Sequence, residues 1–164
     1  MKLCEMSIHD LITVDYACGC GRHHHMAIDH LAIGKSAVNK LTEFLGEQKL
    51  KDGTALSKED KIYVIADVHT WPVAGEVVYD LVKAAGYPVE YYIFPHEEMH
   101  TNEIFIGELQ DVMPKDVKLA IAVGSGTIND LVRMVSFKRQ IPYYIIGTAP
   151  SMDGFATDVA PATI

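Results

Sequence analysis

The sequence predicts an α/β fold, with a Rossmann-like parallel sheet and helices on both faces. Four short apolar runs rich in β-branched and aromatic residues support this prediction. Each run is nearly continuous rather than alternating, as in strands that are buried on both faces. The runs are KIYVIAD (61–67), VEYYIF (89–94), KLAIAV (118–123) and YYIIG (143–147). Helical apolar periodicity lies between them, and this alternation is typical of βαβ units.

Three helices are predicted between these strands from the spacing of their apolar residues. The first is closed by Gly86, and the second is stopped by Pro114. The third has the i, i+3, i+4, i+7 spacing of an amphipathic helix. The three apolar stripes are Val73, Val77, Leu81 and Ala84; Ile104, Ile106, Leu109 and Val112; and Ile128, Leu131, Val132 and Val135.

The N-terminal segment, at about residues 1–60, is less regular than the rest. The segment is counted with the rest of the chain, because 164 residues suit one domain. Residues 12–18 and 30–33 have the composition of short strands. Residues 36–48 have that of a helix, with Ser36 as the expected N-cap.

Composition limits the class of function. The formal net charge of −8 argues against a nucleic-acid partner, because phosphate contacts need clustered Lys and Arg. No apolar run reaches the ~18 residues of a membrane span, so no membrane partner is expected. The N-terminal MKLCEMSIHD has no apolar signal core, which predicts a cytoplasmic protein. Three cysteines, Cys4, Cys18 and Cys20, fit free thiols in a reducing compartment.

A glycine turn, Gly124-Ser125-Gly126, follows the strand at 118–123 directly. Ligands of open α/β sheets bind where loops leave the carboxyl ends of the strands. Glycines permit positive φ and close approach of a ligand, and the following helix N-terminus attracts a pyrophosphate. The turn is not a Walker A loop, and Asn129 occupies the place of the third glycine of GxGxxG. Alone, it fits phosphate binding and a plain tight turn equally well.

Two carboxylates near such turns have both a structural and a functional interpretation. Thr127 and Asp130 have the spacing of a capping box, which the spacing alone favours. In the functional interpretation, Asp130 faces the ligand from the first helical turn. The next strand ends in GTAPSMDGFA, where Asp153 either hydrogen-bonds a substrate hydroxyl or forms a turn before Gly154.

Together, these stretches carry a family resemblance. GSGTINDLVR, the short link to IPYY, and TAPSMDGFA closely resemble the glycerol-1-phosphate dehydrogenase branch of the iron-containing alcohol dehydrogenase and dehydroquinate synthase superfamily. CGCGRHHH near the start and IADVHT after the first long strand are similar to segments of the same branch. The resemblance implies an oxidoreductase of phospholipid metabolism. Such an enzyme reduces a small phosphorylated substrate, dihydroxyacetone phosphate, to sn-glycerol 1-phosphate, with NAD or NADP as its cofactor.

The resemblance also implies roles for particular residues. The glycine turn would hold the cofactor pyrophosphate, Asp130 would contact the nicotinamide end, and Asp67 would lie near the adenosine ribose. The implied cofactor-binding residues are Asp67, Gly124, Ser125, Gly126, Thr127, Asp130, Thr148 and Ser151, and the implied substrate-binding residue is Asp153.

Members of this superfamily hold a divalent metal (Zn, Ni or Fe) with an Asp and His residues of a C-terminal helical domain. That metal polarises the substrate oxygen as a Lewis acid. We therefore expect that domain, the metal ligands and the catalytic residues to lie outside these 164 residues, so that the chain alone is inactive. The apolar face that the domain would cover predicts a homo-oligomer or other association.

Two alternatives to glycerol-1-phosphate dehydrogenase remain open from the residues. One is a glycerol dehydrogenase or dehydroquinate synthase-like relative, which differs mainly in parts of the substrate site outside this stretch. The other is a non-catalytic nucleotide-binding module.

A cluster of cysteine and histidine residues near the N-terminus invites comparison with zinc sites. Structural zinc prefers four ligands with C-x2-C or H-x3-H spacing, which the C-x-C-x2-H pattern here does not provide. Adjacent histidines in a strand point to opposite faces, so they do not all reach one ion. We therefore expect no metal here, and instead a strand and turn packed near the nucleotide domain. The residues concerned are Cys18, Cys20, His23, His24 and His25.

Overall fold

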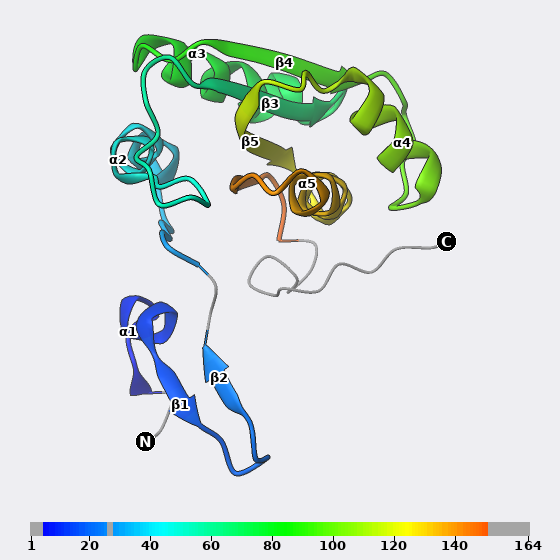
Figure 1. The fold of residues 1–164 in the computed structure, drawn as a ribbon. Helices are drawn as coiled ribbons and strands as arrows, with labels where there is room; N and C mark the ends of the chain where they lie inside the picture. The colour runs from blue at the N-terminus through cyan, green and yellow to red at the C-terminus, as the bar shows by residue number, and fades with distance from the viewer. Residues whose placement is uncertain (1–4, 26–27, 151–164) are drawn as a thin grey trace.

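A computed structural model describes residues 5–25 and 28–150 of the chain. Its centre is a sheet of four parallel strands in the order β4-β3-β5-β6 (Figure 1). The predicted Rossmann-like parallel sheet is therefore confirmed, with strand bounds at or within one residue of those expected. The strands are β3 (Lys61–Asp67), β4 (Val89–Phe94), β5 (Val117–Gly124) and β6 (Tyr143–Gly147).

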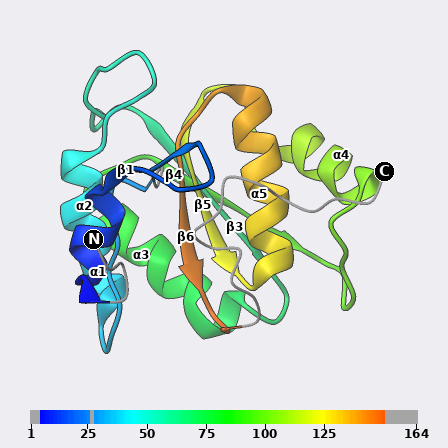
Figure 2. The same cartoon turned by 90° about the horizontal axis from the view of Figure 1, so that it is seen from below.

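Helices cover both faces of the sheet, as predicted (Figure 2). Helices α2 (Leu41–Glu47) and α3 (Glu76–Ala84) pack on one face, against alternate residues of β3 and β5. Helices α4 (Glu103–Val112) and α5 (Gly126–Arg139) pack on the other. Within residues 5–25 and 28–150, no helix has the length and apolar character needed to cross a membrane.

The predicted apolar stripes differ in accuracy. In α5, all four residues of the predicted apolar stripe are buried. In α4 the inner pair, Ile106 and Leu109, is buried, whereas both outer residues of the predicted stripe are exposed.

The stripe predicted for α3 is wrong. Val73 is 67% exposed and Val77 is 50% exposed, whereas Val78 and Val82 are fully buried. The sequence carries two apolar stripes one residue apart, and adjacent helical positions differ by about 100° around the axis. A π-helical turn, η3 (Trp71–Gly75), precedes α3 and adds a residue to that turn of backbone. Docking on the sheet, and not periodicity, selects the stripe.

The N-terminal segment forms a separate unit that stands away from the sheet in Figure 1. It contains α1 (Ile8–Thr13) and an antiparallel hairpin of β1 (Asp15–Ala17) and β2 (His23–His25). The strand expected at 30–33 is absent from the described structure, and β1 pairs instead with β2.

The helix predicted at 36–48 begins differently from the prediction. A 3-10 turn, η2 (Ala37–Lys40), precedes α2, and Ser36 has a left-handed φ of 63° with no capping hydrogen bond from its side chain. The expected Ser36 cap is therefore wrong, because N-cap residues need extended φ and ψ to aim their hydroxyl at the first turn.

Candidate functional site

The two central strands define a topological switch point. The chain leaves β3 toward α3 on one face and leaves β5 toward α5 on the other, so the two loops diverge at the carboxyl edge. Ligands of open α/β sheets bind in the crevice at such a point. The glycine turn after β5 and Asp67 at the end of β3 both lie at this edge. The structure thus brings together residues predicted from separate parts of the sequence.

A buried threonine ties the two loops together. The Thr70 hydroxyl donates to the Val123 carbonyl at 2.9 Å and accepts a hydrogen bond from the Asp67 amide at 3.1 Å. The Asp67 carboxylate in turn accepts from the amides of His69 (2.9 Å) and Thr70 (2.8 Å). This turn fixes how β3 ends beside β5. One oxygen of Asp67 therefore organises the loop that follows β3.

Replacing Thr70 by valine keeps the shape of the side chain but leaves two buried backbone groups without their partner. We expect the free energy of unfolding to fall by about 1–3 kcal/mol, measured by urea denaturation. The matched control is Thr42→Val, at an exposed position of α2, which should change stability by less than about 0.5 kcal/mol. Equal effects of the two substitutions would contradict the bridging role of Thr70.

The first glycine of the turn serves packing rather than backbone freedom. A Cβ at Gly124 would lie 2.6 Å from Cβ of Ile128 and 2.7 Å from its Cγ1. Neither Gly124 nor Gly126 uses the positive φ that glycine permits. Gly124 instead lets α5 approach the end of β5 closely.

Helix α5 begins at the switch point. Ser125 is the N-cap residue, in extended conformation, and its side chain makes no capping hydrogen bond. Thr127 lies inside the helix, so the capping box predicted for Thr127 and Asp130 is not formed. A helix of 14 residues thus directs the positive end of its dipole at the carboxyl edge. This arrangement suits an anionic ligand.

The loop after β6 lies beside the glycine turn, as predicted. The Thr148 amide donates to the Gly124 carbonyl at 3.1 Å, and β5 and β6 are paired up to Gly124 and Gly147. Ser151 and Asp153, the other predicted residues of this loop, lie outside the described residues.

Asp130 is a buried carboxyl in the second turn of α5, not in the first turn as expected. It is 3% exposed and accepts a hydrogen bond from the Asn129 side-chain amide at 3.2 Å. Burial raises the pKa of Asp130, and the nearby Arg133 guanidinium opposes this shift only in part. Arg133 also donates to the hydroxyl of Tyr143 at 2.7 Å, and burial raises the pKa of that phenol. Buried carboxyls with raised pKa values cluster at functional sites.

Asp130 carries a stability cost that depends on pH. Because its pKa is higher in the folded state, ionisation of the carboxyl favours the unfolded chain. We expect Asp130→Asn to raise the melting temperature at pH 7. This advantage should shrink as the pH falls and vanish below about pH 4, where the carboxyl is protonated in both states. A thermal melt series from pH 3 to 8 measures it, and a loss of stability at pH 7 would contradict the assignment.

His96 belongs to a side-chain network at the end of β4. Its Nε2 lies 3.0 Å from an oxygen of Glu108 on α4, and Tyr92 donates to the same carboxylate. His69, after β3, contacts the Glu97 carbonyl at 3.3 Å and joins this loop to the switch point. These contacts have a structural role.

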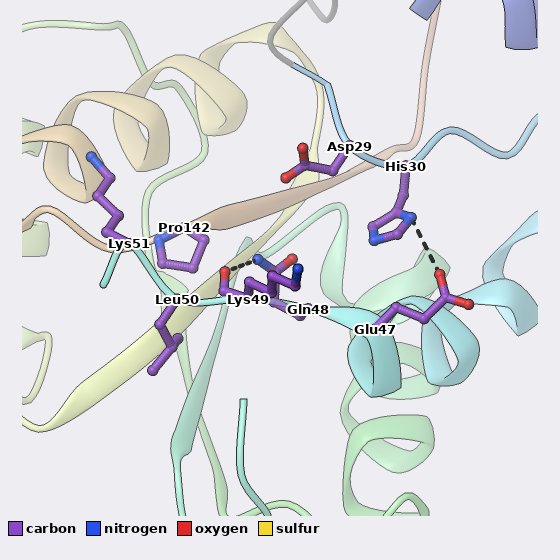
Figure 3. A pocket seen from close by; sticks show the side chains of 8 residues that line it. All are labelled: Asp29, His30, Glu47, Gln48, Lys49, Leu50, Lys51 and Pro142. Atoms are coloured by element: carbon purple, nitrogen blue, oxygen red, sulfur yellow. Dashed lines mark hydrogen bonds and ion pairs between the residues drawn. The ribbon is translucent and has the colours of Figure 1, made fainter. Parts of the chain in front are cut away.

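Sequence reasoning did not anticipate a cavity of about 470 Å³ near the amino end of β6 (Figure 3). His30 faces Glu47 there at 3.7 Å, and the cavity carries charges of both signs. None of the predicted site residues lines it. The lining residues are Asp29, His30, Glu47, Gln48, Lys49, Leu50, Lys51 and Pro142.

The cysteine and histidine cluster is only partly as expected. Strand alternation does separate the three histidines, because His24 pairs with Tyr16 on one face of the hairpin. His24, Cys18 and Cys20 nevertheless lie together, with ligand atoms within 4.8 Å of one another. Among residues 5–25 and 28–150 this is the one group of His, Cys, Asp or Glu that could hold a metal. The missed signal is C-G-C-G-R, which fits a three-residue hairpin loop.

A parallel sheet with helices on both faces, and a helix that starts at its switch point, defines the class of Rossmann-like α/β domains. The sequence model of the iron-containing alcohol dehydrogenase family matches residues 32–164. This chain belongs to that family.

Individual relatives agree with the family assignment. Glycerol-1-phosphate dehydrogenase [NAD(P)+] of Halalkalibacterium halodurans is 37% identical over 148 residues, which cover 88% of this chain and 35% of that protein. The enzyme of the same name from Geobacillus thermodenitrificans is 31% identical, over 92% of this chain and 36% of that protein. The chain thus spans about a third of the length of these relatives.

Solved structures confirm the fold. Glycerol dehydrogenase from Schizosaccharomyces pombe superposes with a TM-score of 0.60 at 18% identity. The match covers 78% of this chain and 31% of that one.

Proposed function

We propose that this chain is the nucleotide-binding half of an NAD(P)-dependent sn-glycerol-1-phosphate dehydrogenase, which reduces dihydroxyacetone phosphate. The observation that carries the proposal is the position of α5, a helix of 14 residues whose N-terminus lies at the switch point directly after β5. The names of the relatives, which cover nearly the whole of this chain, support the choice of reaction.

The geometry suits an NAD(P) molecule lying along the carboxyl edge. In this proposal, the pyrophosphate binds the backbone at Ser125–Thr127, where the helix dipole favours negative charge. Asp67, at the end of β3, borders the adenosine ribose. Asp130, one turn further along α5, lies toward the nicotinamide. Thr148 lines the cofactor site, and Ser151 and Asp153 complete the cofactor and substrate sites.

The catalytic metal of such an enzyme would polarise the substrate oxygen. In the described part of the chain, the carboxyl edge carries no group of side chains that fits it, because the one metal-competent group lies on the β1–β2 hairpin. Its ligands are therefore expected outside the residues that the structure describes. The 164 residues alone are then expected to bind NADH without oxidising it in the presence of dihydroxyacetone phosphate.

The single tryptophan provides a test of cofactor binding. Trp71 lies four residues after Asp67, in the turn that leaves the switch point. Its emission overlaps the absorption of NADH, so NADH bound at this edge should quench it with saturation. We expect Gly126→Val to abolish saturable quenching, because a branched side chain at the first position of α5 would obstruct close approach of the pyrophosphate to the backbone.

The matched control is Gly46→Val, on α2, where an added side chain meets open space. It should bind NADH like the parent chain. Circular dichroism of both variants shows whether they are folded. If Gly126→Val is folded and binds NADH normally, or if the parent chain shows no saturable quenching, the proposal fails.

Location and assembly are further parts of the proposal. We place the protein in the cytoplasm, where the free thiols of Cys18 and Cys20 stay reduced. Self-association is expected because large apolar side chains, including Val73 and Ile104, are exposed. Light scattering tests this, and a clean monomer at high concentration would count against it.

A further inference from the structure

We propose that Cys18, Cys20 and His24 bind one thiophilic divalent cation of the zinc class at the tip of the β1–β2 hairpin. This site is separate from the cofactor edge, because the hairpin stands away from the four-stranded sheet (Figure 1). The inference therefore does not depend on the proposed reaction.

The hairpin loop explains how the three ligands meet. The Cys18 backbone amide donates to the Arg22 carbonyl at 2.8 Å, so three residues form the loop between them. The Gly21 amide donates to the Cys18 carbonyl at 3.0 Å. Gly21 has a φ of +83°, the left-handed residue that a three-residue loop of this kind requires. Cys20 is the middle residue of this loop, at the tip of the hairpin.

Strand register adds the histidine. Tyr16 pairs with His24, and their rings stack at 5.6 Å, so both lie on one face of the hairpin. Cys18, two residues after Tyr16, continues that face because side chains alternate with a period of two. His24 thus comes to lie with its Nε2 3.1 Å from the Cys20 sulfur. His23 and His25, on either side of it, point to the other face.

The chemistry and the spacing of these atoms favour zinc. All three ligand atoms lie within 4.8 Å of one another. Around tetrahedral zinc, the same atoms would be about 3.5–3.8 Å apart, so each separation would have to change by about 1 Å or less. Two thiolates and one imidazole are soft and borderline ligands, which select zinc over magnesium or calcium. Three protein ligands leave the fourth position for water or another donor.

Binding would fix the hairpin. A two-stranded hairpin outside a larger sheet is marginally stable in water. A cation held by the loop and by β2 closes the hairpin at its tip. Each bound thiolate releases its proton, so the affinity should rise with pH.

Cobalt provides a spectroscopic test on the full chain with reduced thiols. Titration of the metal-free protein with Co²⁺ should give thiolate-to-cobalt charge-transfer absorption and the intense visible bands of tetrahedral coordination, saturating at one ion per chain. Added Zn²⁺ should displace the cobalt and abolish these bands. Zinc should also protect Cys18 and Cys20 from alkylation, as measured by peptide mass spectrometry.

Cys18→Ser, Cys20→Ser and His24→Ala should each weaken zinc binding by at least about 10–100-fold, the cost of losing even an outer-shell partner. His25→Ala is the matched control, a neighbouring exposed histidine on the opposite face, and it should bind as the parent does. The parent spectrum tests the proposal even where a variant fails to fold. Cobalt bands without thiolate character, bands that persist in Cys18→Ser, or no binding at micromolar zinc would overturn it.

Discussion

Replacing Gly124 by alanine should lower the free energy of unfolding by about 3 kcal/mol, the upper range for overpacking in a core. The new methyl group would lie 2.6 Å from Cβ of Ile128. Ile128 is fully buried and branched at that atom, so it has no rotamer that moves the clash away. Relief requires α5 to shift away from the end of β5, at the place where the cofactor is proposed to bind.

Urea denaturation measures this free energy of unfolding, and Gly46 on α2 supplies a control with an expected change of opposite sign. It is exposed, and a Cβ there meets nothing within 4 Å. Gly46→Ala should therefore raise stability by about 0.5–1 kcal/mol, because alanine is the better helix former. A Gly124→Ala variant as stable as the parent would show that α5 does not rest on this glycine.

Placing a carboxylate at the start of α5 should separate stability from cofactor binding. Ser125→Asp should raise the stability of the free protein by about 0.5–1 kcal/mol, because Asp is a favourable N-cap and its charge faces the positive end of the helix dipole. The same charge should weaken NADH binding roughly 30-fold or more through repulsion of the pyrophosphate. The two effects have opposite signs, so loss of structure cannot explain the loss of binding.

Ser125→Asn is the matched variant, because Asn has the shape and the capping ability of Asp without its charge. It should bind NADH much more tightly than Ser125→Asp does. Calorimetric titration with NADH at low and at high salt measures the difference, which should narrow as salt screens the repulsion. Equal affinities of the two variants at low salt would place the pyrophosphate away from α5.

The four strands of the sheet were predictable because each is a short, continuous apolar run bounded by polar or turn residues. Helix α5 was predictable for a similar reason, since its four apolar residues define a single stripe. The buried face of α3 was not, because Val77 and Val78 offer two stripes and only the sheet decides between them. When a helix has more apolar residues than one stripe holds, periodicity predicts the helix but not which face of it is buried.

The site divides in the same way. Its location at the carboxyl edge was predictable, because ligands of parallel sheets bind where loops leave the carboxyl ends of the strands. The order of the strands came from the structure. Two details needed coordinates. Gly124 is required by the neighbouring Ile128 side chain, four residues away, and not by its own φ. Thr127 and Asp130 match a capping box in spacing, but the helix begins one residue after Ser125, so the pattern falls in the wrong register.

The cysteine and histidine cluster shows the limit of motif spacing. C-x-C-x3-H lacks the spacing of common zinc sites, and a strand does separate His23, His24 and His25. Hairpin register brings one of these histidines back to the two cysteines. The register of a hairpin depends on the length of its loop. The loop length is harder to read from the CGCGR segment than a ligand motif would be.

The most direct test of the cofactor site is an amide chemical-shift map of the ¹⁵N-labelled chain titrated with NADH. We expect the largest changes at residues 125–128, with smaller ones at Thr148 and at residues 67–70. These are the amides at the switch point. Changes confined to residues 47–51, beside the cavity at the opposite edge of the sheet, or no changes at saturating NADH, would contradict the account.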